Sequence, residues 1–122
     1  MSKILIIEDD PSNAELLASY IKLYGIEAII TYTGQAGFDI GQTLQPDLIF
    51  VDLRMPQPTW DGYKTIFELK TSTTTQHIPV IAITASGNPG KARAMGCDSI
   101  LFRPFRTNQL KEILNQYMAI EQ

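Results

Sequence analysis

The stretch that decides the fold is Leu48-Ile49-Phe50-Val51-Asp52-Leu53-Arg54-Met55-Pro56. Its first four residues are all apolar, which is typical of a strand that is buried on both faces. The run ends on a carboxylate, Asp52, and a buried charge is costly unless something neutralises or uses it. Asp52 is therefore the first candidate for a functional residue.

Three other short apolar runs end on polar residues in the same way. If all four runs are parallel strands of one sheet, their polar ends meet along its carboxyl edge. Open α/β sheets build their sites at that edge, so we expect acids, a hydroxyl and a cation to surround Asp52. The runs are residues 4–7, 80–83 and 100–102, and they are followed by Glu8-Asp9-Asp10, by Thr84 and by Arg103.

The apolar runs alternate with helical patterns, which predicts an α/β fold of the (βα)5 type. The first, third, fourth and fifth runs are apolar throughout, so we expect helices on both faces of the sheet. Asp10 would cap the first helix and Thr107 the last, while the glycines of the second helix weaken it. Strands are expected at 3–8, 26–32, 47–51, 80–83 and 99–102, and helices from Pro11 to Gly25, at 34–43, 62–70 and 89–95, and from Thr107 onward.

The composition is that of an ordinary globular domain. The chain has 122 residues, so residues 1–122 are expected to form one domain without a separate output domain. A net charge of −3 argues against nucleic-acid binding through bulk charge, and no apolar run is long enough to span a membrane. The single cysteine, Cys97, excludes an internal disulfide and indicates a reducing cytoplasm.

The acids Glu8, Asp9 and Asp52 would repel one another at one edge unless a cation lay among them. Two charges about 4 Å apart repel by roughly 4 kcal/mol at an effective dielectric of about 20. Mg²⁺ is the expected cation, because it takes hard oxygen ligands and bridges carboxylates to phosphate. Asp52 could then form an acyl phosphate, with Thr84 donating its hydroxyl and Arg103 pairing with a phosphoryl oxygen. Taken singly, each residue could equally be a helix cap, a solvated acid or a strand-end residue.

Four motifs in order give the chain a resemblance to a known family. The sequence resembles a response-regulator receiver domain of two-component signalling, of the stand-alone single-domain type. The matching stretches are Ile4-Leu5-Ile6-Ile7-Glu8-Asp9-Asp10, residues 46–56, Ile78-Pro79-Val80-Ile81-Ala82-Ile83-Thr84-Ala85, and Ala94-Met95-Gly96-Cys97-Asp98 running on to Arg103-Pro104-Phe105.

The resemblance implies a flavodoxin-like, doubly wound parallel sheet of strand order 2-1-3-4-5. It implies that Asp52 is the phosphoacceptor, Asp9 a direct Mg²⁺ ligand, and Glu8 a ligand through a metal-bound water. The backbone carbonyl of Arg54 would complete the metal shell, and Thr84 would be the switch hydroxyl. The bond between Arg103 and Pro104 would be cis.

The chain also departs from the family pattern. Arg103 stands where the family has lysine, and Ile100 stands at the switch position, where the family has an aromatic residue. The segment between Thr84 and Gly96 looks shorter than in the family by about one helical turn, which is about 3.6 residues. The loop after Pro56 looks longer than usual. These departures put the family's usual output face in doubt.

Two functions remain open from the sequence. The first is a phosphorylation switch that takes a phosphoryl group from a histidine kinase or phosphotransfer protein and acts on an unidentified downstream protein. Such a domain is not an enzyme in the usual sense, although it assists its own phosphorylation and dephosphorylation. The alternative is a receiver-like binding module that works without phosphorylation, which Arg103 and Ile100 suggest. A flavin carrier would need a phosphate cradle where this chain has Glu8-Asp9-Asp10, and a haloacid-type phosphatase would need Asp-x-Asp after the first strand.

Overall fold

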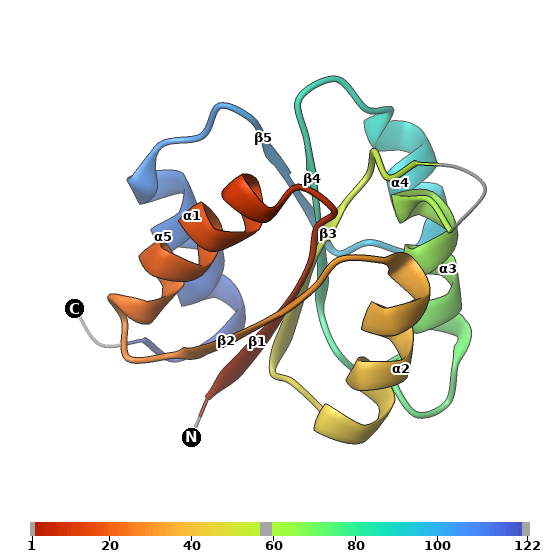
Figure 1. The fold of residues 1–122 in the computed structure, drawn as a ribbon, viewed down its shortest axis with the longest axis horizontal. Coiled ribbons are helices and arrows are strands. Elements are labelled where there is room, and N and C mark those ends of the chain that lie inside the picture. Colours follow the sequence, from red (N-terminus) through yellow and green to blue (C-terminus); the bar gives the residue numbers. More distant parts are fainter. Residues whose placement is uncertain (1, 57–59, 121–122) are drawn as a thin grey trace.

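The computed structural model describes residues 2–56 and 60–120 of the chain. Within these ranges five parallel strands form one sheet of order β2-β1-β3-β4-β5, as the resemblance implies (Figure 1). The doubly wound (βα)5 prediction is therefore confirmed. The strands are β1 (Lys3–Ile7), β2 (Glu27–Thr31), β3 (Leu48–Asp52), β4 (Val80–Thr84) and β5 (Ser99–Phe102).

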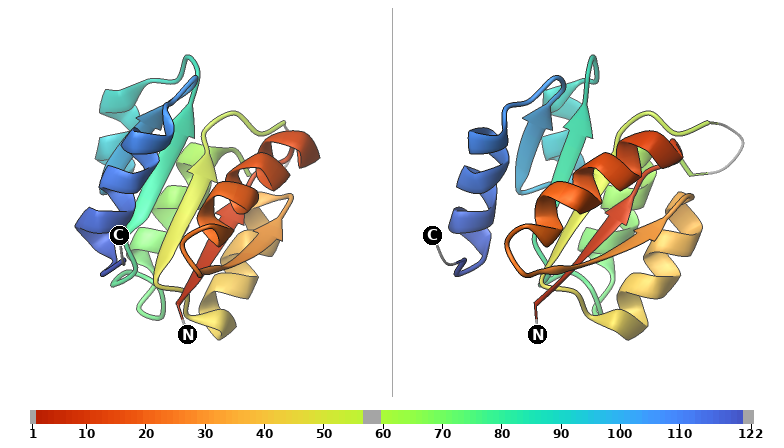
Figure 2. Two further views of the ribbon diagram at one scale, coloured as in Figure 1. Left: turned by 90° about the vertical axis from the view of Figure 1, so that its left-hand side faces the viewer. Right: turned by 60° about the vertical axis from the view of Figure 1, so that its left-hand side comes forward.

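The helices form two layers, one on each face of the sheet. Helices α1 (Pro11–Lys22) and α5 (Thr107–Tyr117) cover one face (Figures 1 and 2). Helices α2 (Gly34–Leu44), α3 (Gly62–Thr71) and α4 (Pro89–Met95) cover the other. In the described part of the chain, none of the helices is both long and apolar enough to span a membrane.

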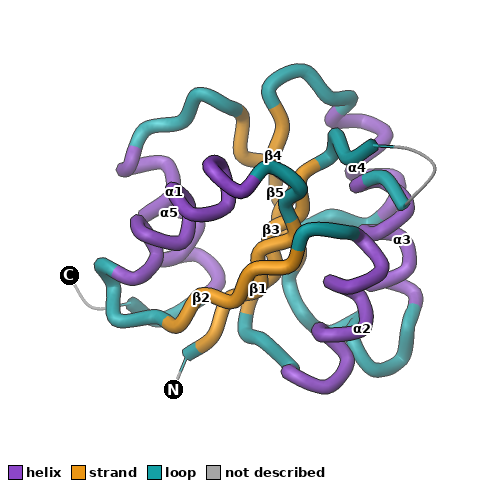
Figure 3. The backbone as a smooth tube through the Cα atoms, in the orientation of Figure 1, coloured by secondary structure: helices purple, strands orange, loops and turns teal. Residues whose placement is uncertain are grey.

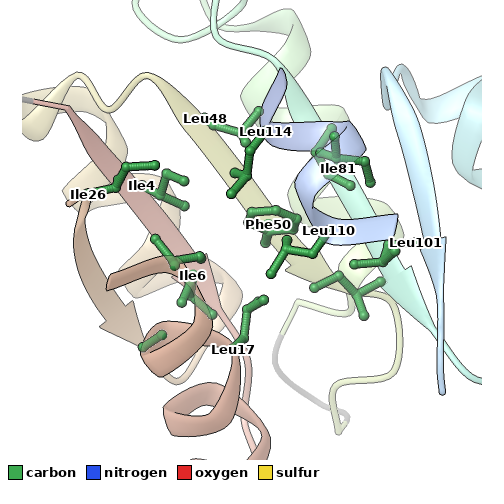
Figure 4. Packing of buried hydrophobic residues seen from close by; sticks show 14 of the residues in the cluster. Ile4, Ile6, Leu17, Ile26, Leu48, Phe50, Ile81, Leu101, Leu110 and Leu114 are labelled. Carbon is green, nitrogen blue, oxygen red and sulfur yellow. The ribbon is translucent and has the colours of Figure 1, made fainter. Parts of the chain in front are cut away.

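The side chains of each strand alternate between the two faces and so build two cores. Ile4 and Ile6 of β1 point toward α1 and α5, where they pack around Phe50 (Figure 4). Leu5 and Ile7 point to the opposite face and pack beneath α2, α3 and α4. Because both faces of β1, β3 and β4 are covered, their polar residues can emerge only at the ends of the strands.

One part of the burial prediction is wrong. The apolar run of β5 is not covered on both faces, because Phe102 is 48% exposed. The reason is that β5 is an edge strand, hydrogen-bonded to β4 alone, and Phe102 is its last residue.

The helix caps were predicted correctly at one end of the chain and not at the other. Asp10 caps α1 as expected, since its side chain accepts a hydrogen bond from the backbone N–H of Ser12 at 2.9 Å. Thr107 was expected to cap α5, but it is already the first helical residue, and Arg106 is the cap. The N–H of Arg106 donates to the side-chain oxygen of Gln109 at 2.7 Å, so a side chain from inside the helix provides the hydrogen-bond acceptor for the cap residue.

The glycines that weaken α2 in the sequence have a packing role in the structure. A Cβ at Gly37 would collide with the side chain of Ile7, and one at Gly34 would collide with the hydroxyl of Thr65. The helix therefore forms from 34 to 44 despite its low propensity, because glycine lets it lie close to β1 and α3.

Candidate functional site

The predicted site residues meet at the carboxyl edge of the sheet. The register pairs Ile7 with Val51 and Asp52 with Ile83, so Glu8 follows β1 directly beside Asp52. Thr84 pairs with Phe102, which brings Arg103 next to Thr84 at the end of β5. The loops that leave β4 and β5 lie at the top of the tube in Figure 3.

Three of the predicted residues form one acidic cluster. Ligand oxygens of Glu8, Asp9 and Asp52 all lie within 4.8 Å of one another. Glu8 and Asp52 are only 2% and 6% exposed, while Asp9 is half-buried. Oε2 of Glu8 accepts a hydrogen bond from the N–H of Asp10 at 3.1 Å, which fixes the orientation of its carboxylate.

Arg103 partly neutralises this cluster. Its Nη2 lies 2.5 Å from Oε1 of Glu8, and its Nη1 lies 3.6 Å from Oδ1 of Asp52. Two nitrogens of one planar guanidinium thus contact two different carboxylates. A lysine has a single ammonium group, which acts as a point charge and lacks this forked geometry. The sequence predicted that Arg103 would reach the site, but not that Glu8 would be its nearer partner.

The acids nevertheless hold protons more tightly than usual. The pKa of Glu8 is raised from 4.5 to about 7, first by burial and then by the neighbouring Asp52, against the lowering effects of the Asp10 N–H and of Arg103. Burial likewise raises the pKa of Asp52. One guanidinium therefore does not compensate for removing the acids from water, and the site favours an additional cation or a proton.

The backbone around Asp52 is held tightly. The N–H of Arg54 donates to Oδ1 of Asp52 at 3.2 Å. Behind this turn lies Gly62, the first residue of α3, where a Cβ would collide with the carbonyl oxygen of Asp52 and with Cα of Leu53. Only glycine lets the N-terminus of α3 approach the nucleophile candidate so closely.

The hydroxyl of Thr84 faces the loop between β4 and α4. Thr84 is buried, and its Oγ1 accepts hydrogen bonds from the N–H groups of Ser86 at 3.1 Å and Gly87 at 2.6 Å. Its proton is still available for donation, because both of these bonds use the oxygen as an acceptor. The side chain of Arg54 crosses to the same loop and donates to Oγ of Ser86 at 2.9 Å.

A hollow of about 440 Å³ lies beside the acidic cluster. Arg54 lines it, although the role of its backbone carbonyl as a metal ligand stays a prediction. Asp61 also lines it, and its side chain caps α3 by accepting from the N–H of Lys64 at 2.8 Å. The prediction of a longer loop after Pro56 lies outside the described residues. The hollow is lined by Asp9, Leu53, Arg54, Met55, Pro56 and Asp61.

Two further residues lie near the site, one that the sequence analysis singled out and one that it did not. Ile100, at the predicted switch position, is half-buried in β5 and packs on the core beneath α2, α3 and α4. Tyr63 was not predicted at all, yet its hydroxyl accepts a hydrogen bond from the N–H of Asn88 at 2.7 Å. Nothing in the sequence motifs points to Tyr63, because the contact depends on how α3 packs beside α4.

The model of the response regulator receiver domain family matches residues 4–115 of this sequence. The chain belongs to this family. This receiver domain is 30% identical over 119 residues to the polar-differentiation response regulator DivK of Brucella ovis, with 95% of each chain covered. The same identity and coverage hold for DivK of Brucella suis.

Solved structures of receiver domains agree with this assignment. The receiver domain of sensor histidine kinase PA1611 from Pseudomonas aeruginosa, solved with a magnesium ion in its active-site cleft, superposes with a TM-score of 0.86 at 25% identity, covering 95% of this chain and 96% of that one. The receiver domain of a histidine kinase from Syntrophus aciditrophicus gives 0.88 at 27% identity, covering 98% and 91%. Chemotaxis protein CheY4 of Vibrio cholerae, at 21% identity over 97% and 99%, shares the fold with a TM-score of 0.86.

Proposed function

We propose that this receiver domain is a signalling switch that accepts a phosphoryl group on Asp52 from the phosphohistidine of a histidine kinase or phosphotransfer protein. The observation that carries the proposal is the position of Asp52, a buried carboxylate that lies close to two other acids and to the guanidinium of Arg103. A buried carboxylate with a perturbed pKa and a cation beside it is typical of a residue that reacts as a nucleophile.

The residues present fit a Mg²⁺ ion. The three carboxylates are hard oxygen ligands within 4.8 Å of one another, and Asp9 lines a hollow of about 440 Å³. Burial and the neighbouring Asp52 raise the pKa of Glu8, so a cation at the cluster would stabilise the charged carboxylates. Asp9 and Asp52 would hold the ion directly, with Glu8 acting through a water and Arg54 through its carbonyl. When bound, Mg²⁺ offsets negative charge on the carboxylates and on the phosphoryl oxygens.

In the proposed transfer, an oxygen of Asp52 forms a bond to phosphorus while the phosphorus–nitrogen bond of the donor breaks. The other ring nitrogen of the phosphohistidine carries a proton, so the leaving group is a neutral imidazole. The N–H of Arg54, which already donates to Asp52, orients the attacking carboxylate. Arg103 pairs with one phosphoryl oxygen, and the hydroxyl of Thr84 donates to another. The domain supplies these groups to its own phosphorylation and to the later hydrolysis, and it is not an enzyme acting on a separate substrate.

The donor would dock beside this edge of the sheet. A largely apolar hollow of about 350 Å³ opens between α1 and the segment that follows β5, with Arg103 in its wall. Leu16, which also lines it, is 54% exposed, so a partner that covers it removes apolar surface from water in the hollow that Arg103, a neighbour of Asp52, also lines. We place the domain and its donor in the cytoplasm, where the buried Cys97 stays reduced. The hollow is lined by Asn13, Leu16, Leu17, Tyr20, Ala85, Arg103, Pro104 and Phe105.

The experiment is the intact mass of the folded protein after incubation with acetyl phosphate and Mg²⁺, measured beside Asp52→Asn. We expect a gain of one phosphoryl group that is absent from the variant and absent when EDTA removes the metal. If the folded protein gains no mass from acetyl phosphate or from a panel of phosphorylated donors, the phosphorylation-independent binding module is the better account.

A further inference from the structure

Tyr63 holds the loop between β4 and α4 from the side of α3. It lies in the first turn of α3, and its Oη accepts the N–H of Asn88 at 2.7 Å. Asn88 is the N-cap of α4, with its side-chain oxygen accepting the N–H of Lys91 at 3.0 Å. The ammonium of Lys91 in turn lies 4.4 Å from the centre of the Tyr63 ring. One side chain of α3 therefore contacts both the cap and the first turn of α4.

Thr84 holds the same loop from the other side. Its Oγ1 accepts the N–H of Gly87, the residue before Asn88, at 2.6 Å. Gly87 is closely surrounded, since a Cβ there would lie 2.7 Å from both Oγ1 of Thr84 and a methyl carbon of Leu53, and 3.1 Å from Oη of Tyr63. The two hydroxyls thus bind two consecutive residues, Gly87 and Asn88, and the first of these has little free space around it.

A movement of Thr84 has to reach Tyr63 through this segment. If the Thr84 hydroxyl shifts toward a phosphoryl group on Asp52, the N–H of Gly87 must follow it or lose its acceptor. Leaving this half-buried N–H without an acceptor is unfavourable, so following is favoured. Moving Gly87 moves Asn88, whose N–H is bound to Tyr63. Ile100, at the predicted switch position, has an aliphatic side chain that cannot form a hydrogen bond of this kind.

We propose that Tyr63 is a positioning residue that holds the β4–α4 loop in its unphosphorylated arrangement and passes the shift of Thr84 to α4. The inference rests on the proposed function, because it requires a phosphoryl group on Asp52. It has two consequences. The Tyr63 hydroxyl opposes the shift of Thr84, and the surface that changes on phosphorylation is the one formed by α3 and α4.

The test compares Tyr63→Phe with the wild type in binding beryllofluoride, a mimic of the aspartyl phosphoryl group, in the presence of Mg²⁺. This variant keeps the aromatic ring and its contact with Lys91 and removes one hydroxyl. The matched control is Tyr117→Phe, which removes a hydroxyl that bonds Ser99 and the carbonyl oxygen of Asp98. Binding is followed by amide NMR signals of Gly87 and Lys91, which flank the deleted bond.

We expect Tyr63→Phe to bind beryllofluoride about two- to tenfold more tightly, which is the range that the net contribution of one hydrogen bond gives. In the free variant, the Gly87 and Lys91 signals should lie part of the way toward their positions in the bound wild type. Tyr117→Phe should match the wild type in both measurements.

The inference is overturned if Tyr63→Phe binds beryllofluoride like the wild type, binds it more weakly, or changes no more than Tyr117→Phe. In those cases the wild type still binds the mimic, and the proposed function stands. If the wild type itself neither binds beryllofluoride nor gains a phosphoryl group, the proposed function fails and the inference fails with it.

Discussion

Arg103 forms its closest ion pair with Glu8, with Nη2 of the guanidinium 2.5 Å from Oε1 of the carboxylate. The same guanidinium lies 3.6 Å from Asp52, so the cation at the end of β5 bridges Glu8 and the proposed phosphoacceptor. The first prediction follows from this double contact.

Replacing Arg103 with methionine should slow phosphorylation by acetyl phosphate about 10- to 100-fold, because one charge-assisted hydrogen bond to the phosphoryl group is lost. Arg103→Lys should react at a rate between those of Arg103→Met and the wild type, because the charge remains but the double contact with Glu8 and Asp52 is lost. Rates come from intact mass against time. Equal rates for Arg103→Met and the wild type would remove Arg103 from the proposed mechanism.

The stability of the domain should fall as the pH rises. Burial raises the pKa of Glu8 from 4.5 to about 7, so the folded state binds this proton more tightly than the unfolded state does. The resulting stabilisation is fully present below about pH 4.5 and is lost as the pH rises through about 7, and it amounts to at most about 3 kcal/mol. Urea unfolding without metal at several pH values measures it.

Glu8→Gln should remove most of this pH dependence and should be more stable than the wild type at pH 8, a condition set about one unit above the folded pKa. The control is Glu15→Gln, a change at an exposed acid, which should keep the wild-type profile. A profile that rises with pH in the metal-free wild type would contradict the burial argument.

Removing one proposed metal ligand, Asp9, should reduce the effect of Mg²⁺ on the free energy of unfolding. In the wild type, millimolar Mg²⁺ should raise the urea midpoint at pH 8, because a cation that binds only the folded state stabilises it. Asp9→Asn should lose most of this gain. Asp47→Asn alters an acid on the loop before β3, outside the cluster, and should keep the gain. An equal gain in Asp9→Asn and the wild type would show that the cation acts elsewhere.

A methyl group behind the proposed nucleophile should be poorly tolerated. Gly62→Ala places a Cβ against the backbone of Asp52 and Leu53, and we expect a loss of stability of about 1–3 kcal/mol from overpacking. Gly90→Ala is the matched control, because its Cβ would meet nothing closer than the Asn88 side-chain oxygen at 3.4 Å. That change should cost nothing, or stabilise α4 by up to about 1 kcal/mol. Equal urea midpoints for both variants would contradict the packing account.

A charge introduced on the rim of the apolar hollow should slow phosphorylation by a protein donor but not by a small-molecule donor. Leu16→Asp should slow phosphoryl transfer from a phosphorylated histidine protein about tenfold or more, because it places a charge on surface that the partner buries. Its rate with acetyl phosphate should stay that of the wild type. Equal slowing with both donors would mean that the substitution disturbs the site itself.

The fold could be predicted almost completely from the sequence, because burial on both faces makes β1, β3 and β4 continuous apolar runs. The second helix was the least certain, since its glycines lower helix propensity and their packing against Ile7 and Thr65 appears only in three dimensions. The exposure of Phe102 was missed because an apolar run does not distinguish an edge strand from a central one.

The site could be predicted as a set of residues but not as a network. Glu8, Asp9 and Asp52 come together because parallel strands end at one edge, which the sequence pattern already implies. The bond from Arg54 to Ser86 and the bond from Asn88 to Tyr63 depend on side-chain rotamers and on the packing of α3. No periodicity or motif encodes these contacts.

The central claim is that Asp52, and no other acid in the cluster, carries the phosphoryl group. Borohydride reduces an aspartyl phosphate to homoserine, and trypsin then separates the candidates, because Asp52 lies on the peptide 23–54 while Glu8 and Asp9 lie on 4–22. After treatment with acetyl phosphate and Mg²⁺, we predict homoserine at position 52 and none in 4–22. Homoserine at position 9, or at neither place in protein that has gained a phosphoryl group, would contradict the account.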